Sequence, residues 1–458
     1  MRKAVLFFSK GKKNKARAMK VMKFGGAVLK SVDGFRAMVE IVKASAEEPL
    51  LIVVSAFSKS TSRLQEAAIS AESGLESKSY KILDGVIDEN ASFYHFLIKE
   101  NEHINKLNAF FKKSSEEIRS FLKGISITRE VTPRTMDLIL SYGELFALQI
   151  VSQYFSSQGF TFTMFNATDI IVTNDNYGNA SPIIVKTFQN VKKFILPAIE
   201  NNSILLTQGF VARSENGEIT TMGMESSNLT AALLANMLDA KELTIWTDVE
   251  GFRSNDPKIV SNTELIPFID FKTARFLSMS GMKLLYPSML DFLEEKNIKL
   301  VYRSAFNPTG DSTVINSNIN NNIDSISQPI TMIITKPNLF RIKINDIIYN
   351  EICELLYAIA KTNSTYYLSM SRTGLNLLTT KKVILPTKFN PEYDKDISLI
   401  SCLNLPSSAN HFTSENMNEI EKHYDRCFCG NILRIVVPDN NSEEIIRSLH
   451  YSMTNKNV

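Results

Sequence analysis

Cysteine is scarce in this sequence, and its placement argues against a zinc-binding or disulfide-stapled protein. The four cysteines all lie in the last quarter of the 458 residues, and none forms a CxxC pair. They are Cys353, Cys402, Cys427 and Cys429. The last two are too close together for a usual zinc knuckle. We therefore expect buried or free thiols, which fit a reducing compartment.

Histidine is also sparse, and long hydrophobic runs and a strong charge imbalance are missing. The five histidines are scattered along the chain, so we interpret them as surface or core residues and not as a catalytic set. No apolar run is long enough for a membrane span. The net charge of +3 argues against a dedicated nucleic-acid or membrane-surface binder. We expect a soluble, cytoplasmic protein without nucleic-acid or membrane partners.

The beginning of the chain is unusual because the first twenty residues carry eight basic residues and no acidic one. The apolar run Val5–Phe8 is too short for a signal-peptide core. Residues 1–18 are predicted to be a disordered basic extension. A targeting peptide, or an upstream start codon with Met19 as the natural start, are the alternatives.

From Met19 onward, the pattern predicts a doubly wound α/β sheet. Val21–Phe24 is a short predicted strand, closed by two glycines, and apolar residues at helical spacing follow over 33–46. Leu50–Ser55 is a continuous apolar run, which is typical of a parallel strand covered on both faces. Strand, loop and helix in succession indicate an α/β domain.

Further elements continue this pattern and then give way to a different one. Residues 76–125 predict a helical insertion, and 134–157 another helix. Strands are predicted at 160–165, 203–207, 243–246 and 298–302, and helices at 182–200, 227–238, 270–280 and 287–296. Residues 316–328 are polar and predict a linker. Residues 329–458 fit two units that approximate βαββαβ, with helices expected at 350–361, 415–424 and 442–453.

Several segments at predicted strand ends carry groups suited to phosphate chemistry, because ligands bind outside the carboxyl ends of strands in such sheets. In KFGG, the glycines let backbone N–H groups approach phosphate oxygens, and Lys23 can neutralise charge on a transferring phosphoryl group. The loop Ser55–Thr61 offers hydroxyls and a lysine for phosphate or carboxylate binding. Read alone, each segment also fits an ordinary turn.

Two more segments extend the set. Thr220–Thr230 opens a helix with Ser, Thr and Gly, which fits either an anion site or ordinary N-capping. Trp246–Phe252, followed by Asn255–Lys258, is a long loop of the kind that commonly carries function. Lys283, in SGMKLLYP, is a further candidate.

In order along the chain, KFGG, VVSA, SYGE, QGF with TTMG, WTDVEGF with DPK, and GMKLLYP resemble the aspartokinases of the amino acid kinase family. The resemblance implies an αβα sandwich with a mainly parallel sheet as catalytic domain over 19–315, a linker over 316–328 and tandem ACT-like, ferredoxin-like α+β domains over 329–458. It also implies phosphorylation of L-aspartate with ATP and Mg²⁺, an amino-acid effector and a homodimer or higher oligomer. Fusion to a homoserine dehydrogenase is excluded, because too few residues remain and no GxGxxG occurs.

The same resemblance implies roles for individual residues. Groups expected at the transferring phosphoryl group and in catalysis are Lys23, Lys283 and Asn228. Groups expected to bind the nucleotide are Gly25, Gly26, Ser55, Thr247, Asp248 and Lys258. Groups expected to bind aspartate are Thr61, Glu144 and Met224, with Glu144 pairing with the substrate ammonium group. No dedicated protein metal cage is visible.

The departures from the family pattern cluster at the amino-acid substrate. Ala27 and Val28 stand where the family usually has two hydroxyls, and Lys258 stands where it usually has arginine. Met224 replaces an arginine that grips the substrate α-carboxylate, and Asn228 replaces an aspartate. Three explanations remain open: Arg213 substitutes for the arginine, the substrate is another acidic amino acid, or the protein is catalytically weak and binds an effector.

Overall fold

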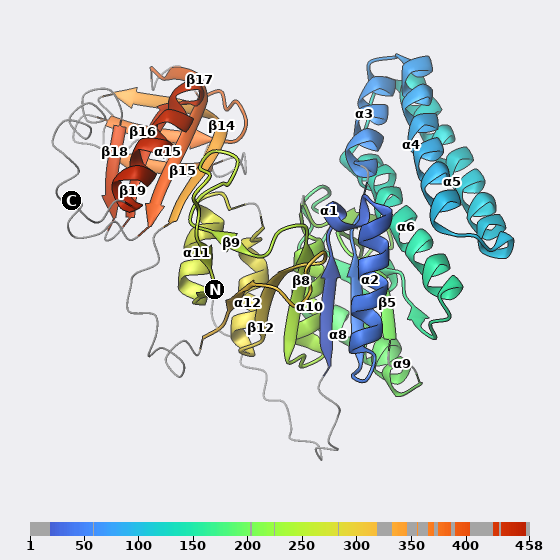
Figure 1. Cartoon of the computed structure of the whole chain (residues 1–458). Coiled ribbons are helices and arrows are strands. Elements are labelled where there is room, and N and C mark those ends of the chain that lie inside the picture. Colours follow the sequence, from blue (N-terminus) through green and yellow to red (C-terminus); the bar gives the residue numbers. More distant parts are fainter. Residues whose placement is uncertain are drawn as a thin grey trace. The chain divides into compact units, whose positions relative to one another are not determined.

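The structure is a computed structural model that describes residues 19–57, 59–201, 204–223, 225–282, 284–317, 332–345, 355, 365–370, 374–385, 390–403, 425–429 and 432–454 (Figure 1). The chain divides into two compact units. Unit 1 comprises Met1–Gly251 and Ser288–Ser317, and unit 2 comprises Phe252–Pro287 and Asn318–Val458. The domain boundaries expected from the sequence stay a prediction, and the predicted basic extension 1–18 and most of the predicted linker lie outside the described residues.

A mainly parallel sheet forms the centre of unit 1. Its strands follow the order β13-β12-β8-β1-β2-β5-β3. They are β1 (Lys20–Phe24), β2 (Leu50–Val54), β3 (Thr163–Met164), β5 (Ile204–Gln208), β8 (Glu242–Thr247), β12 (Lys299–Ser304) and β13 (Ser312–Ile315). β1 pairs in parallel with β2 and β8, whereas β13 is antiparallel to β12. The uninterrupted apolar sequence of β2 is buried at every position, as expected for a strand covered on both faces.

Helices cover both faces of this sheet. α10 (Ser227–Met237) contacts β1, β2 and β8, and nearly every one of its residues is buried. On the other face, α2 (Val32–Ser45) and α6 (Pro133–Ser157) share one hydrophobic core with β1, β2 and β5. The αβα sandwich expected from the sequence is confirmed. The remaining helices here include α1 (Gly26–Leu29) and α12 (Pro287–Glu295).

A helical insertion extends the same core, as predicted for 76–125. Its helices are α3 (Ser60–Glu72), α4 (Glu76–Leu97) and α5 (Asn101–Thr128), which pack with α6. Tyr94, Phe111 and Phe146 lie at the centre of this packing and are almost completely buried. Apolar residues at helical spacing on α4 and α5 therefore bury one face of each helix.

Unit 1 also contains a small second sheet. Its order is β4-β6-β7, with β4 (Val172–Thr173), β6 (Val211–Ser214) and β7 (Ile219–Thr221). The helical elements around it are α7 (Ala167–Ile170), α8 (Ile184–Asn190), η1 (Val191–Ile195) and α9 (Leu196–Asn201). The predicted strand 160–165 shrinks to the two residues of β3, and the predicted helix 182–200 contains the π-helical turn η1.

Unit 2 is built on an antiparallel sheet with the order β15-β16-β14-β17-β19-β18. Its strands are β14 (Met332–Asn345), β15 (Thr365–Met370), β16 (Gly374–Thr379), β17 (Glu392–Leu403), β18 (Asp425–Cys429) and β19 (Ile432–Pro438). α15 (Asp439–Thr454) packs on it, and β9 (Phe252–Arg253), β10 (Leu265–Ile266), β11 (Phe268–Ile269) and α11 (Phe271–Met279) complete the unit. This sheet is consistent with the expected ACT-like region. The helix predicted at 415–424, and all of that predicted at 350–361 except residue 355, lie outside the described residues.

Cys402 is a buried free thiol in the core between β17, β19 and α15, and burial raises its pKa to about 12.

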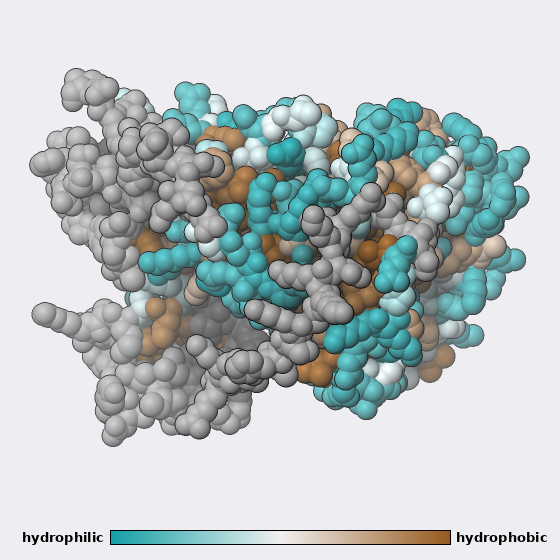
Figure 2. Space-filling model, turned by 90° about the horizontal axis from the view of Figure 1, so that it is seen from below, coloured by the Kyte–Doolittle hydropathy of each residue, from teal (hydrophilic) through white to brown (hydrophobic). Residues whose placement is uncertain are grey.

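In the face that Figure 2 shows, hydrophilic residues cover most of the coloured surface, and hydrophobic ones appear in smaller patches between them. Among the described helices, none combines the length and the apolar character needed to cross a membrane.

Candidate active site

The carboxyl ends of the central parallel strands are joined by backbone hydrogen bonds. Gly25 N donates to Trp246 O at 3.1 Å, and Ser55 N donates to Phe24 O at 3.2 Å. Gly209 N donates to Val54 O at 3.0 Å. The loops that follow β1, β2, β5 and β8 therefore leave the sheet at one common edge, where α/β sheets bind ligands.

Two glycines shape the surface directly after β1. A Cβ built on Gly26 would lie 2.4 Å from the carbonyl oxygen of Ala56, so only glycine allows this close approach of the two loops. A Cβ on Gly25 would lie 3.5 Å from the Lys23 ammonium nitrogen. The absence of side chains here leaves the lysine and the neighbouring backbone open to a ligand.

Lys23 supplies a positive charge at this edge of the sheet. It lies near the end of β1, opposite Val53 of β2 and Ile245 of β8. Desolvation lowers the pKa of Lys23 to about 8, and the carboxylates of Glu144 and Glu225 act in the opposite direction. A desolvated ammonium group without enough compensating charge is poised to gain a bound anion.

Glu144 is the buried acid beside Lys23. It lies on α6, is 5% exposed, and its Oε2 accepts a hydrogen bond from Ala56 N at 2.6 Å. Burial raises the pKa of Glu144 to about 8, although the Ala56 hydrogen bond and the Lys23 charge partly offset this effect. A buried carboxyl with a strongly raised pKa, close to a desolvated lysine, is typical of a functional site.

Thr61, in the first turn of α3, packs against the same helix. A Cβ on Gly143 would lie 2.4 Å from Thr61 Oγ1, so α3 and α6 approach each other closely here. Thr61 Oγ1 is buried and has no hydrogen-bond partner among the described residues. Because such a group costs free energy until it is satisfied, this hydroxyl is available to a ligand.

The loop between β7 and α10 has an unusual backbone. Gly223 and Glu225 both have positive φ, of 90° and 66°. Glu225 is not glycine, so its conformation is strained. Asn228 lies 7% exposed in the first turn of α10, and its N–H donates to Glu225 O at 3.3 Å. Met224, the predicted substrate contact in this loop, lies outside the described residues.

Asp137 supports this loop through hydrogen bonds to the strand that precedes it, and no sequence motif marks this residue. It lies on α6, 1% exposed, and its Oδ2 accepts from Thr221 N and from Gly178 N, both at 2.9 Å. Its Oδ1 accepts from Thr221 Oγ1 at 2.7 Å. Asp137 and Glu144 are seven residues apart, so both lie on one face of α6. One helix therefore fixes the loop after β2 and the strand that leads into the β7–α10 loop.

The end of β8 carries the predicted nucleotide contacts. Thr247 Oγ1 donates to Asp248 Oδ1 at 3.3 Å, and Lys30 Nζ lies 3.5 Å from Asp248 Oδ2. Trp246 stacks on Phe24 with ring centroids 6.1 Å apart. Lys30 comes directly after α1, and the sequence analysis did not identify it.

Two predicted nucleotide or phosphoryl contacts are not placed at this edge. Lys258 is an exposed residue of unit 2, where its N–H donates to Asp256 Oδ1 at 2.9 Å. Lys283 lies outside the described residues. The structure thus brings together Lys23, Gly25, Gly26, Ser55, Thr61 and Glu144, and places Thr247 and Asp248 on the neighbouring strand end.

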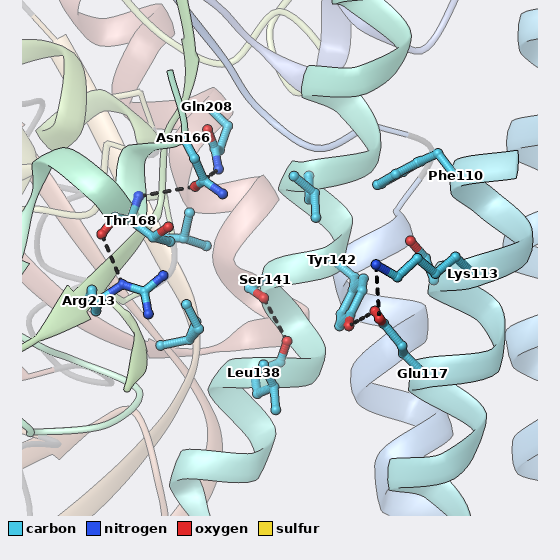
Figure 3. A pocket seen from close by; sticks show the side chains of 14 residues that line it. Phe110, Lys113, Glu117, Leu138, Ser141, Tyr142, Asn166, Thr168, Gln208 and Arg213 are labelled. Carbon is cyan, nitrogen blue, oxygen red and sulfur yellow. Dashed lines mark hydrogen bonds and ion pairs between the residues drawn. The ribbon is translucent and has the colours of Figure 1, made fainter. Parts of the chain in front are cut away.

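Arg213, the candidate replacement for the missing arginine, has other partners. Its Nε donates to Thr168 O at 3.3 Å and its Nη1 donates to Gly217 O at 2.8 Å. Figure 3 shows it on the wall of a groove over α6, across from Lys113 and Glu117. These contacts give no support to the interpretation that Arg213 grips the amino-acid substrate.

Comparisons with known proteins point to one family. The model of the amino acid kinase family matches residues 18–303. Aspartokinase 2, chloroplastic, of Arabidopsis thaliana is 28% identical over 299 residues, which cover 64% of this chain and 54% of that protein. Lysine-sensitive aspartokinase 3 of Escherichia coli is 29% identical over 300 residues, with 64% and 63% covered. The chain spans about half the length of the plant aspartokinases it matches.

Solved structures share the fold. The E. coli aspartokinase III complex with aspartate and ADP gives a TM-score of 0.83 at 22% identity, covering 95% of this chain and 99% of that one. The Clostridium acetobutylicum aspartate kinase gives 0.66 at 18% identity, covering 95% and 100%. The agreement extends over both units of the chain.

Proposed function

The chain belongs to the amino acid kinase family, and we propose that it is an aspartate kinase, which transfers the γ-phosphoryl group of ATP to the β-carboxylate of L-aspartate. The product is 4-phospho-L-aspartate, the first intermediate toward lysine, threonine and methionine. The observation that carries the proposal is the buried Glu144 carboxyl near the partly buried Lys23 ammonium at the glycine-lined end of β1. The similarity to curated aspartokinases supports the same substrate.

The phosphoryl half of the reaction rests on Lys23 and the two glycines. ATP phosphates would lie at Gly25 and Gly26. A side chain at Gly26 would collide with the Ala56 carbonyl, and Gly25 lies next to the Lys23 ammonium. The Lys23 ammonium stabilises charge on the transferring phosphoryl group, which is the main task of a protein in such reactions. Lys283 and the hydroxyl of Ser55 are proposed to assist.

The nucleotide is proposed to lie along the end of β8. Thr247 and Asp248 would contact it. Mg²⁺ would accompany ATP and neutralise part of its phosphate charge, and Asp248 would be the residue that holds it. The Asp248 carboxylate is an oxygen ligand of the type that Mg²⁺ prefers.

The amino-acid half rests on Glu144. Its carboxylate would bind the substrate ammonium group, and this contact compensates the burial that raises its pKa. The buried Thr61 hydroxyl, which has no hydrogen-bond partner among the described residues, would form a hydrogen bond with the substrate. The β-carboxylate is ionised at neutral pH, so the nucleophile needs no general base. An amino-acid effector bound in unit 2, a homodimer or higher homo-oligomer, and a cytoplasmic location are further parts of this proposal.

An assay of product formation tests the proposal. The purified chain is incubated with ATP, Mg²⁺, L-aspartate and hydroxylamine, which traps an acyl phosphate as a hydroxamate. We expect aspartate-dependent hydroxamate from the wild type and from Lys43→Ala, an exposed lysine on α2, and none from Lys23→Ala. Hydroxamate at the Lys23→Ala level in the wild type would contradict the proposal.

A second candidate function follows from the substituted loop. Met224 and Asn228 stand where the family usually has arginine and aspartate. They favour either a kinase for another acidic amino acid or a catalytically weak, effector-binding homologue. Product formation over a panel of acidic amino acids distinguishes the first case. ATP binding by calorimetry without turnover on any member of the panel indicates the second.

A further inference from the structure

The helical insertion approaches the candidate active site at one buried amide, the side chain of Asn90. α4, which carries Asn90, packs against α3, and α3 packs in turn against α6 (Figure 1). Asn90 is 2% exposed, and its side chain meets the first turn of α3. That turn contains Thr61, one of the residues proposed to contact aspartate. A polar group of the insertion therefore lies inside the fold and next to a turn that belongs to the site.

The Asn90 amide nitrogen links α4 to the beginning of α3. It donates to Ser60 Oγ at 3.4 Å and to Val86 O at 2.8 Å. Ser60 is 2% exposed, and its hydroxyl donates in turn to Phe57 O at 2.9 Å. These bonds form a chain with one direction, in which each donor has an acceptor. Through Ser60, the Asn90 amide therefore holds the backbone of the loop that follows β2.

The oxygen of the same amide has no partner. Asn90 Oδ1 is buried and accepts no hydrogen bond from the part of the chain that the structure describes. The carbonyl of Val86 can only accept, so it fixes the amide with its nitrogen toward Val86 and its oxygen away from it. An unsatisfied buried carbonyl costs free energy that an apolar side chain of similar size avoids. Packing alone therefore does not explain an asparagine at this position.

The first turn of α3 lacks the side-chain support that helices usually have at their N-terminus. Its N-cap residue, Lys59, has φ 56° and ψ 23°, and the lysine side chain makes no capping hydrogen bond. A lysine in this left-handed region is strained. The hydroxyl of Ser60 reaches back to Phe57 O. The link from Ser60 to Asn90 is therefore a contact that fixes where this turn lies.

The position of the turn matters because its other side meets α6. A Cβ on Gly143 would lie 2.4 Å from Thr61 Oγ1 and 3.1 Å from Thr61 N, so the turn lies directly on this helix. Glu144, the next residue of α6, accepts from Ala56 N at 2.6 Å and holds the beginning of the same loop. The loop after β2 is thus fixed at one end by Glu144 and at the other by Asn90.

We propose that Asn90 is a positioning residue, through which the helical insertion sets the affinity of the site for its amino-acid substrate. Asn90 acts through Ser60 on the turn that presents the Thr61 hydroxyl, and it does not touch the substrate. The inference rests on the proposed function, in which Thr61 contacts aspartate. That contact is made in the ground state and in the transition state alike, so loosening the turn changes KM and leaves kcat nearly constant.

The variant Asn90→Leu separates positioning from packing, because the two roles predict different results. Leucine leaves Ser60 with its acceptor and removes the unsatisfied carbonyl, so the midpoint of urea unfolding should stay unchanged or rise. In the hydroxamate assay we expect the KM for aspartate to rise about three- to tenfold. The KM for ATP and kcat should stay within about twofold of the wild type.

A second variant breaks the same link from the other side. Ser60→Ala removes the hydroxyl that receives the Asn90 amide, and we expect a similar rise in the KM for aspartate. In the double variant of Asn90→Leu with Ser60→Ala, the two effects should not add, because each removes the same contact. Additive effects would contradict a single path from Asn90 through Ser60.

Hydrogen exchange gives a readout that needs no turnover. Arg63 N donates to Lys59 O at 3.0 Å, and this bond closes the first turn of α3. In the ligand-free protein we expect the Arg63 amide to exchange faster in Asn90→Leu and in Ser60→Ala than in the wild type. Unchanged exchange in both variants overturns the positioning role, whatever the activity of the protein.

Ser79→Ala is the matched control, because it removes a buried contact between the same two helices farther along α3. Ser79 is completely buried, and its hydroxyl donates to Ala67 O at 2.8 Å. This variant should lower the midpoint of urea unfolding and leave the KM for aspartate unchanged. An active wild type with the same KM as Asn90→Leu and Ser60→Ala overturns this proposal alone. A wild type without product overturns the proposed function together with it.

Discussion

Asp137 on α6 accepts hydrogen bonds from both the backbone nitrogen and the hydroxyl of Thr221, at 2.9 and 2.7 Å, across 84 positions of sequence. Desolvation raises the pKa of Asp137, and the hydrogen bonds from Gly178 and Thr221 oppose this effect. Burial therefore costs free energy for the charged carboxylate, and three hydrogen-bond donors stabilise it in return. This arrangement ties the helix that carries Glu144 to the strand that leads into the β7–α10 loop.

Asp137→Asn should impair both stability and activity. The amide places an N–H group where one carboxylate oxygen accepts hydrogen bonds, so at least one bond is lost and a donor faces a donor. We expect a loss of about 2–4 kcal/mol in the free energy of unfolding. We also expect a rise in the KM for aspartate, measured by the hydroxamate assay. Asp88→Asn, an exposed site on α4, should change neither quantity, and an unchanged KM in Asp137→Asn would argue for a purely structural role.

Two glycines of the chain should respond to alanine in opposite directions. Gly26→Ala places a Cβ 2.4 Å from the Ala56 carbonyl, so the loops after β1 and β2 must separate. We expect a loss of about 1–3 kcal/mol in stability together with weaker ATP binding. Gly124 lies exposed inside α5 with open space around it, so Gly124→Ala should stabilise by about 0.5–1 kcal/mol. Urea unfolding of both variants checks the signs.

Glu144 should give the ligand-free protein a characteristic pH dependence. Its pKa rises from 4.5 to about 8 on folding, so between these values the folded state holds a proton that the unfolded chain releases. Stability should therefore fall as pH rises through this window, by at most about 1.4 kcal/mol per pH unit from this group. Glu144→Gln should remove this contribution. Unfolding free energies of both proteins at pH 5, 6 and 7 measure it, and equal slopes would refute the assignment.

The pKa of Lys23, lowered to about 8, predicts the opposite slope at higher pH. Above about pH 8 the unfolded chain binds the proton that Lys23 has released in the folded state, so stability should rise with pH from this group. The two effects are separable because they occupy different windows.

Lys30 and Asp248 form an exposed ion pair beside the proposed nucleotide site. Exposed pairs contribute about 0–1 kcal/mol, so Lys30→Ala should leave the free energy of unfolding nearly unchanged. The KM for ATP should rise, because a cation near the phosphates is lost, while the KM for aspartate stays constant. Lys43→Ala is the matched control. A change confined to the KM for aspartate would place Lys30 at the other substrate.

The sequence predicted those helices and strands whose hydrophobic pattern matches their burial in the fold. Leu50–Val54 is apolar throughout because both faces of the sheet are covered, and that signal is local. β6 and β7 were not predicted, because each is short and is stabilised by pairing with other strands: β6 pairs with β4 and β7. β3 keeps two residues of a longer apolar run, since it pairs only at one edge of the sheet.

The residues of the candidate site also differ in whether the sequence could identify them. Lys23, Gly26 and Glu144 lie in motifs whose order along the chain is informative, so a resemblance could find them. Asp137 has no such signal: it is one of several polar residues on α6, and its partners Gly178 and Thr221 are far away in sequence. Its role depends on a tertiary contact that neither periodicity nor spacing encodes.

The chain has a single tryptophan, and the fold places it near the end of β8, beside the proposed nucleotide site. Trp246 is 5% exposed and stacked on Phe24, the residue that separates Lys23 from Gly25. All tryptophan fluorescence of this protein therefore originates from one position beside the proposed phosphate site. The molecule carries its own optical reporter, and nucleotide titrations can follow its emission without a dye, a label or an engineered probe.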